Sequence, residues 1–291
     1  MPAKLKAVRS FVPLSSVVLS AVVLLPGPVR AAAAEPLTAA QAQALLDRAL
    51  AAELRAAQDT SHPMRYLLRK TTPRLSATRE IYETRDGDVA RLIDINGQPL
   101  SPDAEQREQA RLAALAADPG RQRHRKQAED ADTARALKVL RALPTAFLYT
   151  YEGPGQGPSG PVEKFSFRPN PAFSPPDLET QVLTAMTGAI WIDPAQQRVV
   201  RIEGRLQHDV DFGWGILGRL NKGGWIAIEQ AGVGGGLWRT VRLQMAMSGR
   251  VVWKTHNWDT TEEESRFTPL PVGMSYQQAI DTMRADPAAA R

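Results

Sequence analysis

The second half of the chain alternates apolar and polar residues in one short run after another. The pattern is clearest over residues 198–208 and 237–247. The alternating apolar residues of these two runs are Val200, Ile202, Leu206, Val241, Leu243, Met245 and Met247. Side chains of a β-strand point to opposite faces in turn, so a period of two predicts strands that are buried on one face. Consecutive runs of this kind predict an antiparallel meander.

Other segments extend this sheet in both directions. Further strands are expected over residues 64–70, 75–84, 89–95, 147–151, 162–167, 190–193, 225–229 and 250–258. Asp86-Gly87 and Asn96-Gly97 supply the positive φ angles of tight hairpin turns, although the latter could simply end its strand before Gln98-Pro99. Ser248-Gly249 predicts a short connection between the last two strands.

Helical spacing appears in four places. Residues 37–60 carry leucines and alanines three and four apart behind a possible Thr38 cap, and residues 177–187 and 275–284 predict two shorter helices. The fourth place is a charge-rich insertion over residues 101–143, which opens with Ser101-Pro102, divides at Pro119-Gly120 and is expected to end at Pro144. The expected buried side of its second helix is formed by Ala134, Leu137, Leu140 and Leu143.

A basic cluster within the insertion resembles a nucleic-acid patch when taken alone. It consists of Arg121, Arg123, His124, Arg125 and Lys126. Glu129 and Asp130 follow Arg125 and Lys126 by four residues, however, and this spacing favours a solvated helix face with i,i+4 ion pairs.

The first 34 residues have the order of a secretory signal peptide. A positive start is followed by an uncharged apolar stretch from Phe11 to Leu25 and then by the small residues Ala31 to Ala34. An uncleaved membrane anchor is the alternative, but the apolar stretch is shorter than the roughly 20 residues that span a bilayer. We therefore expect residues 35–291 to form one exported, periplasmic domain without a membrane span. The absence of cysteine removes disulfides, thiolate metal sites and a lipid-anchored cysteine together.

The charge balance argues against nucleic acid as a partner. The chain holds 36 Lys and Arg against 31 Asp and Glu. Four of the basic residues lie in the signal, so the mature chain has 32 and is nearly neutral. No electrostatic case for DNA or RNA binding remains.

No cofactor, metal or catalytic residue is predicted from motifs. Residues 213–218 match G-x-G-x-x-G, but glycines at 223 and 224 stop the helix that a dinucleotide site requires. His208, Asp209 and Asp211 could offer metal ligands, yet strand alternation separates the histidine from both aspartates. A serine triad assembled from distant segments stays open as a possibility. The run Glu262-Glu263-Glu264 is expected to be a solvated strand edge.

Large soft side chains gather in the C-terminal sheet, where all six tryptophans lie after residue 190. Such residues on a curved sheet can line a cavity for acyl chains. The predicted lining is Ile190, Ile192, Val200, Ile202, Leu206, Val241, Leu243, Met245, Met247 and Trp253. The alternative is that helices fill this face and make it ordinary core.

One hairpin carries a family resemblance. Residues 187–194, Thr-Gly-Ala-Ile-Trp-Ile-Asp-Pro, with Arg198 to Gly204 resemble a hairpin of the outer-membrane lipoprotein-sorting (LolA-like) periplasmic proteins and of related secreted bacterial proteins. The resemblance implies an α+β fold, in which an unclosed, strongly curved antiparallel sheet wraps around helices. It further implies a concave face that holds acyl chains.

These observations predict a periplasmic carrier for a lipid or lipoprotein acyl chain, without catalysis. The first alternative is an envelope interaction protein that has a filled core and uses residues 101–143 as a partner surface. An envelope hydrolase is the second alternative.

Overall fold

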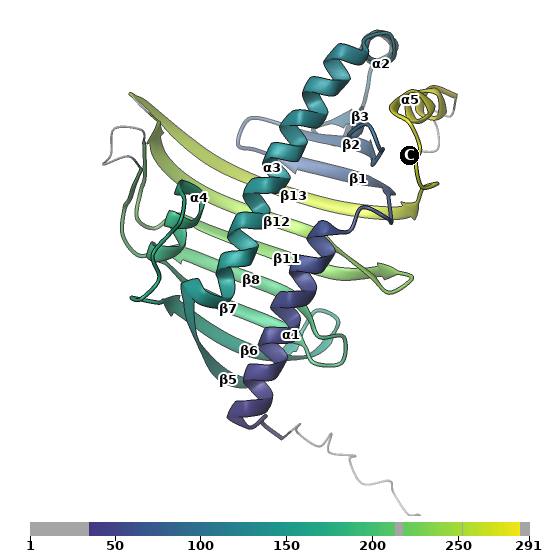
Figure 1. Ribbon diagram of the computed structural model, residues 1–291. Helices are drawn as coiled ribbons and strands as arrows, with labels where there is room; N and C mark the ends of the chain where they lie inside the picture. Colours follow the sequence, from purple (N-terminus) through teal and green to yellow (C-terminus); the bar gives the residue numbers. More distant parts are fainter. Residues whose placement is uncertain (1–34, 213–217, 252, 286–291) are drawn as a thin grey trace, which may run out of the picture. The chain divides into compact units, whose positions relative to one another are not determined.

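An unclosed antiparallel sheet with helices across one face forms the fold, as Figure 1 shows. The computed structural model describes residues 35–212, 218–251 and 253–285, which belong to one unit, Glu35–Arg291. The expected signal over residues 1–34 and the glycine-rich segment at 213–217 lie outside the described residues. The predicted α+β fold with an unclosed sheet is confirmed.

The sheet has 13 strands in the described residues, and every pair of neighbours is antiparallel. Eleven of them follow the order β4-β3-β2-β1-β13-β12-β11-β8-β7-β6-β5; β10 pairs with β12, and β9 pairs with β10. The strands are β1 (Met64–Thr71), β2 (Ser76–Tyr82), β3 (Val89–Ile95), β4 (Gln98–Pro99), β5 (Phe147–Gly157), β6 (Gly160–Pro169), β7 (Met186–Asp193), β8 (Arg198–Leu206), β9 (Val210–Phe212), β10 (Gly218–Leu220), β11 (Trp225–Gly234), β12 (Leu237–Val251) and β13 (Lys254–Pro269).

The pairing of β1 with β13 joins the two ends of the sequence in the middle of the sheet. It places β13 between β1 and β12, so the expectation that Glu262 to Glu264 form a strand edge is wrong. Glu262 pairs with Lys70 at 2.7 Å across this junction.

Three turns were expected from glycine positions, and they have different outcomes. Gly87 has a φ angle of 95° and donates from its N–H to the carbonyl oxygen of Thr84 at 3.1 Å, in the turn between β2 and β3. Asn96 and Gly97 have φ angles of 54° and 73° and connect β3 to the short β4, so they form a tight turn. Ser248-Gly249, in contrast, lies inside β12, opposite Asn257 and His256. A Cβ on Gly249 would lie 2.4 Å from the carbonyl oxygen of Arg219. This glycine therefore allows β10 to pack closely against β12, and it does not form a turn.

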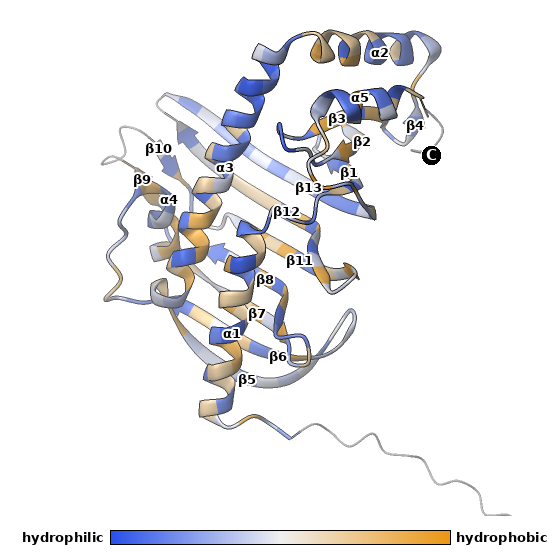
Figure 2. Cartoon of the chain, turned by 45° about the vertical axis from the view of Figure 1, so that its right-hand side comes forward, coloured by the Kyte–Doolittle hydropathy of each residue, from blue (hydrophilic) through white to orange (hydrophobic). Residues whose placement is uncertain are grey.

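The helices are α1 (Ala39–Gln58), α2 (Pro102–Ala116), α3 (Pro119–Ala146), α4 (Leu178–Gln181) and α5 (Tyr276–Ala285), with a 3₁₀ turn, η1 (Val182–Ala185), after α4. α1 and α3 contact each other and cross the same face of the sheet (Figure 1). Figure 2 shows that α3 is hydrophilic near α2 and hydrophobic near α4. The main core cluster lies between α1, the end of α3 and strands β5 to β8.

The ends of α1 and α3 follow from their sequences. Thr38 caps α1 in a reciprocal pair with Gln41, and Asp118 caps α3 by accepting a hydrogen bond from Arg121 N at 2.9 Å. α3 continues through Pro144 to Ala146, so the expected end at Pro144 is wrong. Because Pro144 lies in the last turn, its missing N–H removes only one hydrogen bond near the helix end. Ala134, expected on the buried side, is exposed.

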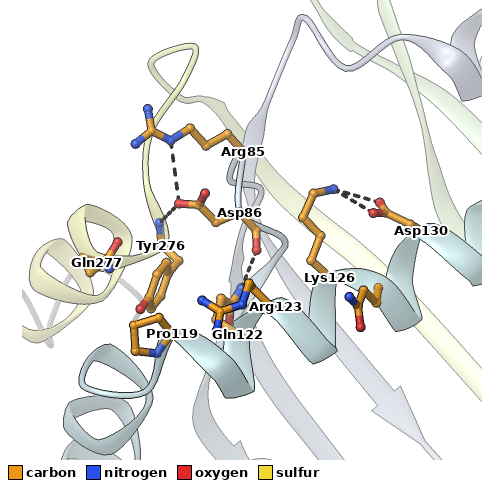
Figure 3. A pocket seen from close by; sticks show the side chains of 10 residues that line it. Arg85, Asp86, Pro119, Gln122, Arg123, Lys126, Asp130, Tyr276 and Gln277 are labelled. Carbon is orange, nitrogen blue, oxygen red and sulfur yellow. Dashed lines mark hydrogen bonds and ion pairs between the residues drawn. The ribbon is translucent and has the colours of Figure 1, made fainter.

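A polar junction fixes the start of α3 against the β2–β3 turn and α5 (Figure 3). The buried Gln122 side chain donates from Nε2 to the carbonyl oxygen of Asp86 at 2.9 Å, and Asp86 accepts from Tyr276 N at 3.2 Å. Lys126 forms the expected pair with Asp130, at 2.8 Å. Glu129 instead accepts from Asp88 N at 2.9 Å. The Arg125 and Glu129 side of the basic cluster therefore contacts the connection between β2 and β3, whereas the Lys126–Asp130 pair is solvated as expected.

A second core cluster packs α2 and α5 together with β2 and β3. Arg91 on β3 is buried beside it and donates to the carbonyl oxygen of Met283 and to Glu105, both at 2.8 Å. Glu108 on α2 accepts from Leu92 N at 2.7 Å. These bonds fasten the helical insertion and the last helix to the same strand.

Candidate ligand pocket

An apolar pocket of about 590 Å³ lies between the second half of α3 and the sheet. Its volume falls within the range of small-molecule sites. α3 covers it, α4 and η1 form one wall, and strands β5 to β8 and β9 to β12 supply the floor. It is lined by Val139, Leu140, Leu143, Phe147, Phe167, Leu178, Glu179, Val182, Leu183, Met186, Ile202, Gly204, Phe212, Leu220, Ile226, Ile228 and Met247.

The charged groups of this pocket are confined to its rim. Glu179 is the one ionisable residue among the described lining residues. Its carboxylate pairs with Lys138 Nζ at 3.2 Å, and Lys138 also lies 3.6 Å from Asp177. These pairs tie α3 to α4 and leave the interior apolar.

A glycine pair in the floor sets the spacing of β7 and β8. Gly188 and Gly204 lie opposite each other. A Cβ on Gly188 would lie 1.8 Å from the carbonyl oxygen of Glu203, and one on Gly204 would lie 2.4 Å from Met186 Sδ. Gly188 therefore requires glycine because the clash is with backbone, whereas a side chain on Gly204 would have to displace the flexible Met186 side chain.

Some of the predicted lining residues meet at this pocket and others do not. Ile202 and Met247 line it, and Ile190 and Ile202 line a second pocket beside it. Ile192 and Leu206 are buried in the main core cluster. Leu243 and Met245 lie opposite Ile228 and Ile226 and so share the floor's face, but they are half-buried outside the lining.

The remaining predicted aliphatic residues, Val200 and Val241, line neither pocket, because each lies at a β-bulge. Val199 pairs with Ile192, and Val200 stands unpaired at a bulge beside it. Thr240 pairs with Gln230 in the same way, and Val241 is the bulged residue. Each bulge shifts the alternation by one position. Val199 and Thr240 consequently line the second pocket in place of Val200 and Val241.

Trp253 lines neither pocket, so the expectation that it lines the cavity is wrong. Its side chain is 88% exposed and lies in the turn between β12 and β13. The prediction put that turn at Ser248-Gly249, which would have made Trp253 part of a strand. Trp191 and Trp225 line neither pocket for a different reason. Their neighbours Ile190 and Ile226 face the pockets, so the two tryptophans face the other side of the sheet. Trp238 lines the second pocket.

The sequence reasoning did not assign the helical part of the lining to the site. Val139, Leu140 and Leu143 on α3 lie three and four residues apart, which is the signal of a buried helix stripe. Leu140 and Leu143 were expected to be buried, but nothing local indicated which face of the sheet they would cover.

The arrangement offers binding chemistry. Within the described residues, no three His, Asp or Glu side chains come together where they could hold a metal ion. Asp209 and Asp211 pair with Arg219, Asp211 at 2.6 Å. None of the helices in the described ranges is both long and apolar enough to cross a membrane.

Comparison with known proteins adds one distant likeness. No protein-family model matches the chain, and no curated protein matches it significantly. A search of solved structures finds a domain from Vibrio parahaemolyticus that is described as a candidate outer membrane lipoprotein-sorting protein domain. The two are 12% identical with a TM-score of 0.26, over 80% of this chain and 95% of that domain. This level of similarity does not place the chain in the lipoprotein-sorting family.

Proposed function

We propose that this chain is an exported, periplasmic binding protein that holds a lipid or lipoprotein acyl chain in the pocket between α3 and the sheet. Binding, and not catalysis, is the activity proposed. The observation that carries the proposal is the lining of the pocket, where sixteen of the seventeen residues are apolar or glycine and Glu179 pairs with Lys138 at the rim. An acyl chain that enters such a space exchanges water for aliphatic and aromatic contacts, at about 0.8 kcal/mol per buried CH₂.

The test uses a fluorescent acyl probe and two matched leucine substitutions. Leu140 lines the pocket from α3, whereas Leu148 on β5 is 38% exposed and lies next to Phe147, on the opposite face of the strand. Leu140→Glu places a charge in the apolar space and should weaken probe binding by about tenfold or more. Leu148→Glu adds the same charge outside it and should leave binding unchanged.

Two results would contradict the proposal. One is a wild-type protein that binds no acyl probe and yields no lipid on solvent extraction. The other is equal binding by the Leu140→Glu and wild-type proteins, when circular dichroism shows both to be folded.

A further inference from the structure

A second pocket adjoins the first beneath α3. It has a volume of about 600 Å³ and lies toward α1, where Leu50, Ala56 and Ala57 contribute to it. Five residues line both pockets, Val139, Leu140, Leu143, Ile202 and Ile228. A molecule held under α3 can therefore extend from one pocket into the other past these shared side chains.

The second pocket has a polar side that the first one lacks. Glu53 and Arg198 form a bidentate pair there at 2.8 and 3.1 Å. Glu83 accepts hydrogen bonds from Met64 N at 2.8 Å and from Arg239 at 3.3 Å. Each of these two carboxylates thus has a guanidinium partner, and the two pairs together carry no net charge.

Glu264 on β13 also lines this side, and it has no such partner. Within the described residues, the structure contains no hydrogen bond or ion pair to its carboxylate. Burial, with Glu262 and Glu83 nearby, raises the pKa of Glu264 to about 7, and Arg239 only partly opposes this rise. A carboxylate in this position lacks a cation, because the charges around it are mostly of its own sign.

The neighbouring Tyr66 adds a neutral hydroxyl group to the same side. Burial and the charge of Glu264 hold the pKa of its phenol above the usual value, so it stays protonated. The ring stacks on Phe267 with centroids 5.4 Å apart, which fixes its position. The polar side therefore presents an unmatched carboxylate beside a fixed hydroxyl, next to an apolar space.

We propose that the ligand is a cationic amphiphile, a single long alkyl or acyl chain with a primary amine, whose ammonium group pairs with Glu264. The chain would run past Leu140 and Ile202 into the apolar pocket. This assignment rests on the proposed function and adds the class of head group. An ammonium group supplies the positive charge that Glu264 lacks, whereas a fatty carboxylate would add a fourth carboxylate to Glu53, Glu83 and Glu264.

The test compares three competitors of equal chain length against the acyl probe on the full-length protein. Dodecylamine and dodecanoate are titrated below their micelle concentrations and dodecanol below its solubility limit, at pH 8, where Glu264 is ionised and an alkylamine is still charged. We expect dodecylamine to displace the probe at about tenfold lower concentration than dodecanol, and dodecanoate to be the weakest.

Two glutamine variants of one strand then locate the effect. Glu264→Gln removes the proposed partner and should abolish the preference for the amine. Glu263→Gln removes the same charge from the adjacent residue, which faces the other side and lies 3.9 Å from Arg242, and should retain the preference.

Equal displacement by the amine and the alcohol, or stronger displacement by dodecanoate, would overturn the head-group assignment and leave the apolar pocket intact. An amine preference that survives Glu264→Gln would overturn it too. Failure of the probe itself to bind would instead contradict the proposed function.

Discussion

Replacing Glu53 with alanine removes the acceptor that fastens α1 to the sheet. Its two carboxylate oxygens accept four hydrogen bonds, from Arg198 Nε at 2.8 Å, Arg198 Nη2 at 3.1 Å, Val199 N at 3.1 Å and Gln230 Nε2 at 2.9 Å. The side chains of Glu53 and Arg198 are only 9% and 14% exposed. The substitution therefore leaves a buried guanidinium and a buried backbone N–H without this partner.

The size of the loss follows from this burial. Removing one member of a buried ion pair costs about 3–5 kcal/mol, mainly because the remaining charge is left without compensation. With a urea m-value of about 3 kcal/mol per M, the unfolding midpoint should fall by roughly 1 to 2 M. The cation–π contact of Arg198 with Trp238, at 5.7 Å, survives the change and compensates for little of it.

Urea denaturation followed by far-UV circular dichroism measures the shift. Glu203→Ala is the matched control, because Glu203 pairs with Arg201 but its side chain is 41% exposed, and a surface pair of this kind contributes about 0–1 kcal/mol. The double variant Glu53→Leu with Arg198→Met should regain most of the stability, since it removes the uncompensated charge. A Glu53→Ala midpoint no lower than that of Glu203→Ala would refute the reasoning.

Two further predictions concern stability. Gly188→Ala should destabilise the protein by about 3 kcal/mol or more, because its Cβ would lie 1.8 Å from the carbonyl oxygen of Glu203; a thermal melt like that of the wild type would contradict this. Burial raises the pKa of Asp88 to about 7, so the folded protein retains a proton that the unfolded chain releases near pH 4. Stability from this group should be lost as the pH rises from 5 to 8, and Asp88→Asn should reduce that loss. An equal fall in the urea midpoint of the wild-type and Asp88→Asn proteins between pH 5 and pH 8 would contradict this prediction.

Local patterns were sufficient for most elements of the fold. Strict alternation located β8 and β12, and Ser101-Pro102 marked the start of α2. The predictions were wrong where a residue's role depends on a contact with a residue far away in the sequence. Gly249 has the composition of a turn, yet it makes room for β10, and this misplaced the turn that contains Trp253.

The polar part of the candidate site could not be found locally. Glu264 stands in a run of three glutamates, which is typical of a solvated strand edge. Its burial depends on β1, almost 200 residues earlier in the chain, which pairs Leu68 with Glu264. Likewise, the stripe on α3 predicts burial, but the strands that it covers are set by how the sheet is assembled.

The β1–β13 pairing also determines when the protein can fold. Synthesis begins at the N-terminus, so β1 is made long before its partner β13, and one edge of β1 stays open until β13 has been made. The second core cluster, which packs α2 against α5, also cannot form until after β13 is made, because α5 follows β13 in the chain. Pairings of such high contact order close slowly, since a long loop must be ordered first. We therefore expect the hairpin of β1 and β2 to be the part of the nascent chain most dependent on protection from aggregation.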